Sequence, residues 1–370
     1  MAAERTLDTR ALNRALLDRQ LLLRRQRVSP VRAIERLVGL QAQATLPPYL
    51  ALLARLDGFE AGQLDRLLLS RRAVRIAAMR STVHLLTADD ALALRTLAQP
   101  VTERELYGNA TYAAIRQVDA DALIDAVRPF VDAQPRTNAE IGAFLSERWP
   151  DVDRRTLAHA VRCLLPMAQV PPRGILGQGG QVRTTPVDTW VGRPLHPQPS
   201  WDAVVPRYLA AFGPATVADA QKWSTITGLA EVFERLRPGL RTFRDERGRE
   251  LFDVPRGRLP RPDTPAPVRF LGEYDNVLLS HADRTRIVDE GVRRGLASGP
   301  NGAFACGVLI DGFVGAFWSV DRDEGRAVLR VELLRPVTSA EGDDLQVEGR
   351  RLLAFLEPDA DAHLEVVNQS

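Results

Sequence analysis

Two glutamines that flank a single apolar residue are the first candidates for chemistry in this sequence. Gln41 and Gln43 lie on either side of Ala42, shortly before Pro47-Pro48. A carboxamide carries no charge and is not a strong base, but it accepts a hydrogen bond from water and donates one to an oxygen, so it can hold both in place. Residues i and i+2 share a side in extended structure and not within a helix, and the prolines predict that a helix ends near Gln43. On the residues alone, two polar residues that cap a helix end remain the alternative.

Other familiar catalytic and ligand-binding patterns are absent from the sequence. It has no phosphate-binding loop, dinucleotide fingerprint, zinc-protease helix or nucleophile elbow. The glycine-rich stretch 177–180 predicts the tip of a hairpin and not a phosphate site, because it does not precede a helix. The five histidines lie far apart, and none has a metal-ligand spacing to a cysteine or an acid: His84, His159, His196, His281 and His363. The sequence therefore predicts no metal ion and no cofactor.

The bulk properties indicate a globular protein that stays where it is made. A chain of 370 residues is long enough for two or three domains with buried cores. It contains no run of about 18 apolar residues that would span a membrane, and charges occupy the N-terminal stretch where a signal peptide would be apolar. Cys163 and Cys306 are the only cysteines, which suits a reducing compartment. We expect a cytoplasmic protein without a membrane partner.

Charge is segregated along the chain, although the formal net charge is only +2. Lys222 is the only lysine among 49 basic residues. Residues 66–88 and 154–187 each hold five arginines and no acid, whereas residues 339–370 hold eight acids and two arginines. This distribution predicts a positive face suited to phosphate groups. Ordinary solvated faces are the alternative.

A pattern of two helices followed by two strands occurs three times and has the outline of a winged helix. In the middle copy, Thr137 and Glu140 have capping-box spacing, a second helix covers 154–169, and two strands flank the glycine-rich turn within 173–190. The later copy predicts helices in 215–224 and 227–240 and strands around Glu246-Arg247-Gly248. The N-terminal copy is more divergent, with a helix that begins at Ser29-Pro30 and continues over 31–43, a second in 64–74, and extended backbone over 76–87.

The C-terminal part is rich in β-branched and aromatic residues. These runs cover 268–288, 303–320 and 327–337, and Asp311-Gly312 predicts a tight hairpin turn. Residues 351–356 predict a closing helix. We therefore expect an α+β protein in which winged-helix units over residues 1–133, 134–200 and 201–262 surround an antiparallel, β-barrel-like scaffold domain over residues 263–370.

Several short motifs, taken in order, resemble the AlkZ-type winged-helix DNA glycosylases. The resemblance covers roughly residues 10–355. It depends on the motifs occurring together and in the family's order, because a Gln-x-Gln pair alone is too short to be specific. A related branch of that family has aspartate at the position of Gln43. The motifs in this chain are Gly39-Leu40-Gln41-Ala42-Gln43-Ala44, Pro47-Pro48-Tyr49, Met79-Arg80-Ser81-Thr82-Val83-His84-Leu85, Val170-Pro171-Pro172-Arg173-Gly174 and Asn276-Val277-Leu278-Leu279-Ser280-His281-Ala282-Asp283-Arg284.

The resemblance implies duplex DNA on a concave basic face and the excision of alkylated purines, with Gln41 and Gln43 as catalytic residues. It also implies interstrand crosslinks as substrates, since related members protect organisms that make DNA-alkylating natural products. We expect a monomer in the nucleoid that binds double-stranded DNA containing these lesions. For His84, the alternative to a phosphate contact is a strand residue whose hydrogen bonds are made within the protein. The predicted DNA contacts are Arg80, Ser81, Thr82, His84, Arg173, Arg183, Lys222, His281 and Arg284.

Neutral glutamines suit one kind of leaving group. An N7-alkylated purine is already positively charged and departs as a neutral base, so an enzyme mainly needs to orient water beneath an oxocarbenium-like transition state. A winged-helix transcriptional regulator without enzymatic activity is the alternative function. The sequence disfavours it, because it has no heptad or apolar helix pair for the dimer that symmetric operators generally need.

Overall fold

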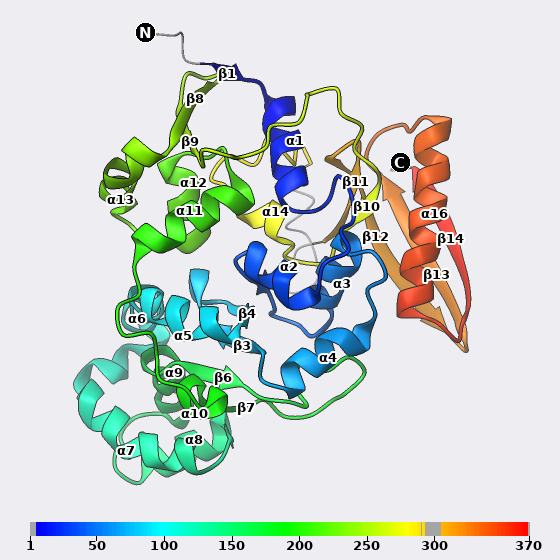
Figure 1. Ribbon diagram of the computed structural model, residues 1–370. Helices are drawn as coiled ribbons and strands as arrows, with labels where there is room; N and C mark the ends of the chain where they lie inside the picture. Colours follow the sequence, from blue (N-terminus) through cyan, green and yellow to red (C-terminus); the bar gives the residue numbers. More distant parts are fainter. Residues whose placement is uncertain (1–4, 290, 293–304, 369–370) are drawn as a thin grey trace.

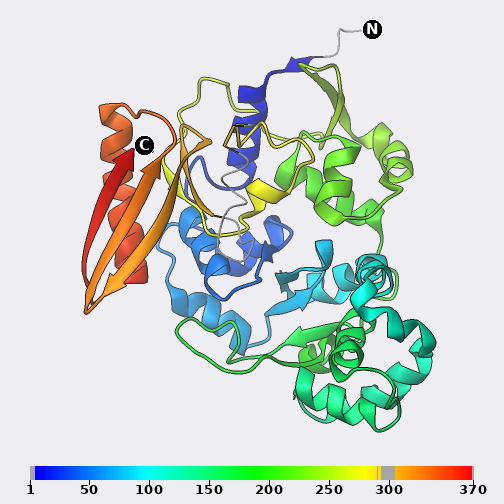
Figure 2. The same cartoon turned by 180° about the vertical axis from the view of Figure 1, so that it is seen from behind.

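The computed structural model describes residues 5–289, 291–292 and 305–368, which form three sheets surrounded by helices (Figure 1). The mixed α+β class expected from the sequence is confirmed. The C-terminal sheet and one long helix form one end of the molecule, drawn in orange and red, and the same division is visible from behind in Figure 2. No helix among the described residues is long and apolar enough to cross a membrane.

A six-stranded antiparallel sheet connects the N-terminal region to the middle of the chain. Its order is β2-β4-β3-β6-β7-β5, and the two regions meet where Arg75 of β3 pairs with Gln169 of β6. The β3–β4 hairpin contains a single 3-10 turn, Met79–Ser81. The strands are β2 (Leu40–Gln41), β3 (Ala73–Ala77), β4 (Val83–Thr87), β5 (Arg136–Thr137), β6 (Met167–Gln169) and β7 (Arg183–Pro186).

The helix expected to end near Gln43 ends earlier. It begins at Pro30, as predicted, but its last residue is Arg36. Pro47 and Pro48 lie inside the first turn of the next helix, where the missing N–H of proline costs no hydrogen bond. The prolines therefore begin a helix, and Gln41 is left in a strand. The helices here are α2 (Pro30–Arg36), α3 (Leu46–Arg55), α4 (Ala61–Leu69), α5 (Ala88–Leu97) and α6 (Gln99–Gly108).

The middle region has the predicted helix–helix–strand–strand order, but its strands are displaced. The capping box at Thr137 and Glu140 is present. The first strand, β6, lies within the predicted second helix, and residues 173–182 form turns and loop instead of a strand. Pro171 and Pro172 cannot donate to a ladder, which explains why the strand stops at Gln169. The helical segments are Ala110–Gln117 (a 3-10 segment), α7 (Ala120–Ala133), α8 (Asn138–Ser146), α9 (Arg154–Leu164) and α10 (Val187–Val191).

The third region also includes the beginning of the described chain. Strand β1 (Thr6–Leu7) pairs in parallel with β8, and α1 (Thr9–Arg19) contacts α11. The predicted strands around Glu246-Arg247-Gly248 are present as an antiparallel pair. The elements are α11 (Trp201–Phe212), α12 (Val217–Ser224), α13 (Leu229–Leu236), a 3-10 turn (Arg237–Gly239), β8 (Arg241–Asp245) and β9 (Glu250–Asp253).

The C-terminal sheet is open and not a closed barrel, which corrects the expectation. Its order is β10-β11-β12-β13-β14, and the last pair is parallel. The turn at Asp311-Gly312 is confirmed, with both residues at positive φ. The predicted closing helix is present and longer than expected. The elements are β10 (Arg269–Phe270), α14 (Asn276–Leu279), β11 (Cys306–Ile310), β12 (Phe313–Asp323), β13 (Arg326–Leu333), α16 (Ser339–Leu356) and β14 (Asp361–Asn368).

Two of the predicted β runs in this part need separate comment. The run over 268–288 is mostly wrong, because only β10 is a strand and Asp275 then caps the short helix α14. Residues 303–304 of the next predicted run lie outside the described residues, and the rest of that run forms β11 and most of β12.

A buried ion pair joins the N-terminal region to α14. Both terminal nitrogens of Arg55 donate to the carboxylate of Asp275, at 2.8 and 2.7 Å, and the two side chains are 0% and 1% exposed. The neighbouring Asn276 donates from Nδ2 to the carbonyl of Gly39 at 2.8 Å. Gly39 directly precedes β2, so this ion pair helps to fix the backbone that leads into Gln41.

We predict that Asp275→Ala destabilises the protein by about 3–5 kcal/mol, because it leaves the Arg55 guanidinium buried and unpaired. Urea unfolding measures the change. Asp57→Ala is the control, since it removes the partner of Arg27 from a pair exposed to solvent and should leave stability unchanged. Equal stabilities of the two variants would contradict this role of the ion pair.

Candidate active site

Gln41 and Gln43 lie at the edge of the six-stranded sheet, where β2 runs beside β4. Gln41 pairs with His84, and the amide of Ala42 continues the ladder by donating to the carbonyl of Val83 at 2.7 Å. Gly39 precedes this strand at φ +90, and a Cβ there would lie 2.3 Å from a Leu86 methyl group. The backbone is therefore extended at Gln41, as the i, i+2 argument requires, whereas Gln43 lies in the bend that follows β2.

The protein holds both carboxamide oxygens in place. Oε1 of Gln41 accepts from Nη2 of Arg80 at 2.8 Å, and Oε1 of Gln43 accepts from the amide of Val83 at 2.8 Å. Because both partners are donors, the orientation of each amide is defined. Neither Nε2 group has a partner among the described residues. Gln41 is 6% exposed and Gln43 is exposed, so the donor ends of the two amides face solvent at different depths.

Arg80 is the residue that orients Gln41. Its guanidinium lies 3.1 Å from Nε2 of His84 and donates to the carbonyl of Trp223 at 2.7 Å. The backbone of Arg80 has φ +58, in the left-handed region. Since its terminal nitrogens already bind these three groups, Arg80 is part of the frame of the site, and we do not propose for it the phosphate contact expected from the sequence.

His84 is neutral, which matches its hydrogen bonds. Its Nδ1 lies 2.9 Å from the carbonyl of Thr82 and must donate, so Nε2 accepts from Arg80. Burial, and then the charge of Arg80, lower the pKa of His84 to about 3. Burial, and then the charge of Arg284, lower the pKa of Arg80 to about 10. Neither residue changes its charge near neutral pH.

Arg75 fixes the main chain around Gln43. The side chain is 1% exposed and donates to the carbonyls of Ala42 at 2.7 Å and Ala44 at 3.2 Å. Gly174 allows this close packing, because a Cβ there would lie 2.4 Å from Cδ of Arg75. The sequence placed Arg75 on a positive face, but the structure shows it as a buried anchor for the segment that carries the glutamines.

The comparisons with known proteins lead to the same family that the ordered sequence motifs resemble. Residues 34–355 match the family model described as DNA glycosylase AlkZ-like. The chain belongs to this family. It is therefore a DNA glycosylase, and the transcriptional regulator considered as an alternative is not favoured.

Both a sequence and a structural comparison of this AlkZ-like glycosylase lead to Streptomyces sahachiroi. In the sequence comparison, an interstrand DNA cross-link repair glycosylase from that organism is 25% identical over 329 residues, which cover 82% of this chain and 85% of the relative. The solved structure of the DNA glycosylase AlkZ matches with a TM-score of 0.79 at 19% identity, over 98% of this chain and 100% of that one. The second likeness shows that the fold is shared.

Two histidines predicted to contact DNA are buried in this AlkZ-like glycosylase. His84 is 2% exposed and both of its ring nitrogens are engaged, which favours the alternative of a strand residue whose hydrogen bonds are made within the protein. His281 is 1% exposed, and its Nε2 lies 3.1 Å from the carbonyl of Phe212. A direct phosphate contact does not fit either ring, and we do not propose one for them.

The other predicted contacts remain near the surface. Lys222 is exposed on α12, and Arg183 is exposed on β7, although it pairs with Glu140 at 3.1 Å. Arg173 and Arg284 are half-buried, as are Ser81 and Thr82 of the β3–β4 turn. Arg284 lies close enough to Arg80 to affect its pKa, so two segments far apart in sequence meet at this site.

Sequence reasoning missed three groups that complete the frame of the site. Trp223 contributes only its carbonyl, which no side-chain pattern reveals. Glu105 accepts from the hydroxyl of Ser81 at 3.4 Å, and Arg162 donates to the carbonyl of Ser81 at 3.4 Å. These contacts join residues 24 to 143 positions apart, beyond the reach of a local motif.

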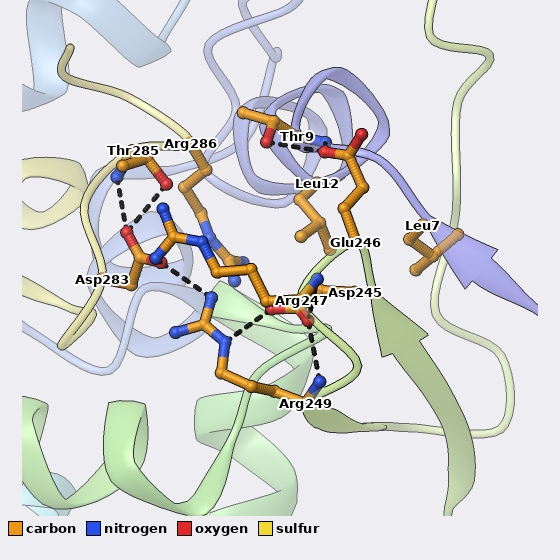
Figure 3. A pocket seen from close by; sticks show the side chains of 10 residues that line it. All are labelled: Leu7, Thr9, Leu12, Asp245, Glu246, Arg247, Arg249, Asp283, Thr285 and Arg286. Carbon is orange, nitrogen blue, oxygen red and sulfur yellow. Dashed lines mark hydrogen bonds and ion pairs between the residues drawn. The ribbon is translucent and has the colours of Figure 1, made fainter.

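A small cavity lined by charged residues lies where the β8–β9 hairpin contacts the segment around Asp283, and it is not a second active site. It has a volume of about 40 Å³, room for a water molecule and not for a nucleobase, and Figure 3 shows its lining. Arg247 and Arg249 of the β8–β9 hairpin both donate to Asp283, at 2.9 and 2.7 Å. The cavity's charges are thus paired, and the hairpin is fixed to the segment that precedes Arg284.

We predict that Arg80→Ala lowers the single-turnover rate of excision by about 10²-fold and leaves DNA affinity nearly unchanged, because Gln41 loses the donor that orients it. Rate and Kd are measured on the same duplex containing 7-methylguanine. Arg330→Ala, in the C-terminal sheet, is the control. A Kd that weakens as much as the rate falls would show that Arg80 contacts phosphate, as the sequence first suggested.

Proposed function

We propose that this glycosylase hydrolyses the N-glycosidic bond of cationic, N7- or N3-alkylated purines in double-stranded DNA, with Gln41 and Gln43 orienting the attacking water. The supporting observation is that two neutral carboxamides lie at one strand edge with their oxygens fixed by protein donors. Among the described residues, no carboxylate forms a hydrogen bond to either glutamine side chain. The pair is therefore suited to positioning and not to proton transfer.

The chemistry follows from the charge of the lesion. A cationic purine leaves as a neutral base, so its departure needs no proton donor, and positive charge develops on the sugar. Each Oε1 uses one lone pair for its protein donor and keeps the other for a water hydrogen. A water held in this way directs its own lone pair at the anomeric carbon, and the proton that it loses after the attack passes to solvent. The Nε2 groups remain available to donate to a sugar or phosphate oxygen.

The positive surroundings favour the DNA backbone more than the lesion. Arg80 and Arg284 lie together, and the half-buried Arg173 is close enough to Arg75 to affect the pKa of that residue. We propose phosphate contacts for Arg173, Arg183, Lys222 and Arg284, with Ser81 and Thr82 beside the lesion. Arg183 would exchange its pairing with Glu140 for a phosphate. Phosphates close to the sugar would in turn stabilise the oxocarbenium-like transition state.

The helix–helix–strand–strand segments are the proposed DNA-reading parts. In a winged helix the second helix enters the major groove and the hairpin touches the backbone. By this reasoning α9 and α13 are the groove helices, and a monomer presents both. Crosslinks are included among the proposed substrates because the relative from Streptomyces sahachiroi is an interstrand DNA cross-link repair glycosylase.

We predict that Gln41→Ala and Gln43→Ala each lower excision of 7-methylguanine by roughly 10²–10³-fold while Kd for the duplex changes little. The reason is that each amide positions water and contributes little to DNA binding. Single-turnover rates and fluorescence anisotropy measure the two quantities. Gln198→Ala, which alters an exposed loop glutamine outside the proposed DNA-reading segments, is the control. Full activity in both variants, or equal losses of rate and affinity, would remove this assignment.

We predict that Arg173→Ala weakens binding to damaged and undamaged duplexes about equally and lowers the salt slope of log K by roughly one unit. The side chain lies half-buried beside the anchor Arg75 and is proposed to meet a phosphate. Titrations at several salt concentrations give the slope. Arg322→Ala, in the C-terminal sheet, should behave as the unaltered protein does. An unchanged slope for the Arg173 variant would exclude the phosphate role.

A further inference from the structure

A cluster of metal-ligand side chains lies between α6 and α9. Glu105 comes from α6, and His159 and Cys163 come from one face of α9, one helical turn apart. Nε2 of His159 lies 3.0 Å from Oε2 of Glu105, and Sγ of Cys163 lies 3.1 Å from the same oxygen and 3.5 Å from Nε2 of His159. Three different ligand atoms thus converge on one point. No metal ion was expected from the sequence, although a spacing of four places His159 and Cys163 on one face of a helix.

The distances are close to those of a tetrahedral zinc site. Typical zinc–nitrogen, zinc–oxygen and zinc–sulfur bonds place neighbouring ligand atoms about 3.4–3.6 Å apart. The nitrogen–sulfur distance of 3.5 Å already has this value. The carboxylate of Glu105 would have to withdraw by about 0.5 Å to make room for the ion. Rotation of one flexible side chain is sufficient for this change.

The surroundings hold the ligands and leave one side open. The ring of Tyr112 stacks on that of His159, with centroids 4.0 Å apart, and fixes its orientation. Cys163 is fully buried, whereas the side chain of His159 is 16% exposed and lines a groove of about 550 Å³ with Tyr112 and Arg155. The side chains of His159 and Glu105 are 16% and 30% exposed, so water can supply a fourth ligand, as in zinc sites with three protein ligands.

We infer that Glu105, His159 and Cys163 bind one Zn²⁺ ion, with a water molecule as the fourth ligand. Binding converts the thiol to a thiolate and releases its proton to solvent, and the Nε2 proton of His159 moves to Nδ1 by exchange with solvent. The carboxylate, the thiolate and the ion are together neutral. Arg162 lies 3.1 Å from Oε2 of Glu105, and its positive charge favours the thiolate form of Cys163.

The proton released by Cys163 makes binding dependent on pH. The metal must displace this proton, so affinity rises with pH.

The site would stabilise the turn that carries Arg80 and is separate from the proposed chemistry. Glu105 and Arg162 both contact Ser81, which follows Arg80 in the β3–β4 turn. An ion that binds α6 and α9 together would therefore stabilise the two helices whose side chains contact Ser81. Its presence is measured without DNA, so failure of this inference leaves the glycosylase assignment untouched.

Zinc content and cobalt spectroscopy of the purified full-length protein test the inference. We expect one Zn²⁺ per chain, loss of more than about 100-fold in zinc affinity in Cys163→Ala and in His159→Asn, and no change in Cys306→Ala. Replacement by Co²⁺ should give a thiolate-to-cobalt charge-transfer band in the unaltered protein and in Cys306→Ala, and none in Cys163→Ala. Absence of stoichiometric binding to the chelator-treated protein, or equal affinity in all variants, would overturn the proposal. Circular dichroism establishes that each variant is folded.

Discussion

The hydrogen bond from Arg80 to the oxygen of Gln41 is the interaction on which the proposed chemistry depends. A glutamine cannot be activated by ionisation, so it acts only through its position and the direction of its amide. Arg80 supplies that direction and is itself held by His84 and by the carbonyl of Trp223. One guanidinium therefore connects β2, β4 and α12. The proposed catalytic residue is aligned by contacts from two regions of the chain that are far apart in sequence.

Several arginines of this structure are buried, so the high arginine content does not by itself indicate a surface that binds phosphates. Arg14, Arg55, Arg75 and Arg95 are among the largest side chains that are fully buried. Their terminal nitrogens donate to carbonyl or carboxylate oxygens, as Nη2 of Arg95 does to the carbonyl of Cys163 at 2.8 Å, whereas Nε of Arg55 and of Arg95 has no partner among the described residues. A buried guanidinium is costly unless its donors are paired. Many arginines thus hold segments together, and counting them in acid-free windows overestimates the surface available to phosphates.

Local rules predicted those parts of the fold that local interactions determine. The helix start at Pro30, the capping box at Thr137 and the turn at Asp311-Gly312 each depend on a few neighbouring residues, and all three are confirmed. At Gln41 two local rules disagreed: the prolines predicted a helix that ends near Gln43, whereas the spacing of the pair predicted the extended backbone that the structure has. The open C-terminal sheet was not expected, because closure is decided by how distant edge strands pair. Burial of His84 and His281 also depends on distant packing, which the sequence pattern does not contain.

The candidate site was half predictable for the same reason. The ordered motifs identified Gln41, Gln43 and the β3–β4 turn, but they could not assign Arg80 to the frame of the site. That role depends on Trp223, which lies 143 positions away. The cluster at Glu105 differs, because two of its members, His159 and Cys163, lie only four residues apart on one helix. Their spacing is a local signal that the sequence contains. Long-range contacts therefore determine what the recognised residues do.

The central claim is that neutral glutamines suffice because the leaving base is already cationic. The most direct test is single-turnover excision, with enzyme in excess, from matched duplexes that contain one 7-methylguanine, one hypoxanthine or one uracil. A neutral base must be protonated or stabilised as an anion when it departs, and neither Gln41 nor Gln43 supplies a proton. The account predicts release of 7-methylguanine and no release of hypoxanthine or uracil. Comparable rates on the cationic and neutral bases would contradict it and would show that an acid takes part.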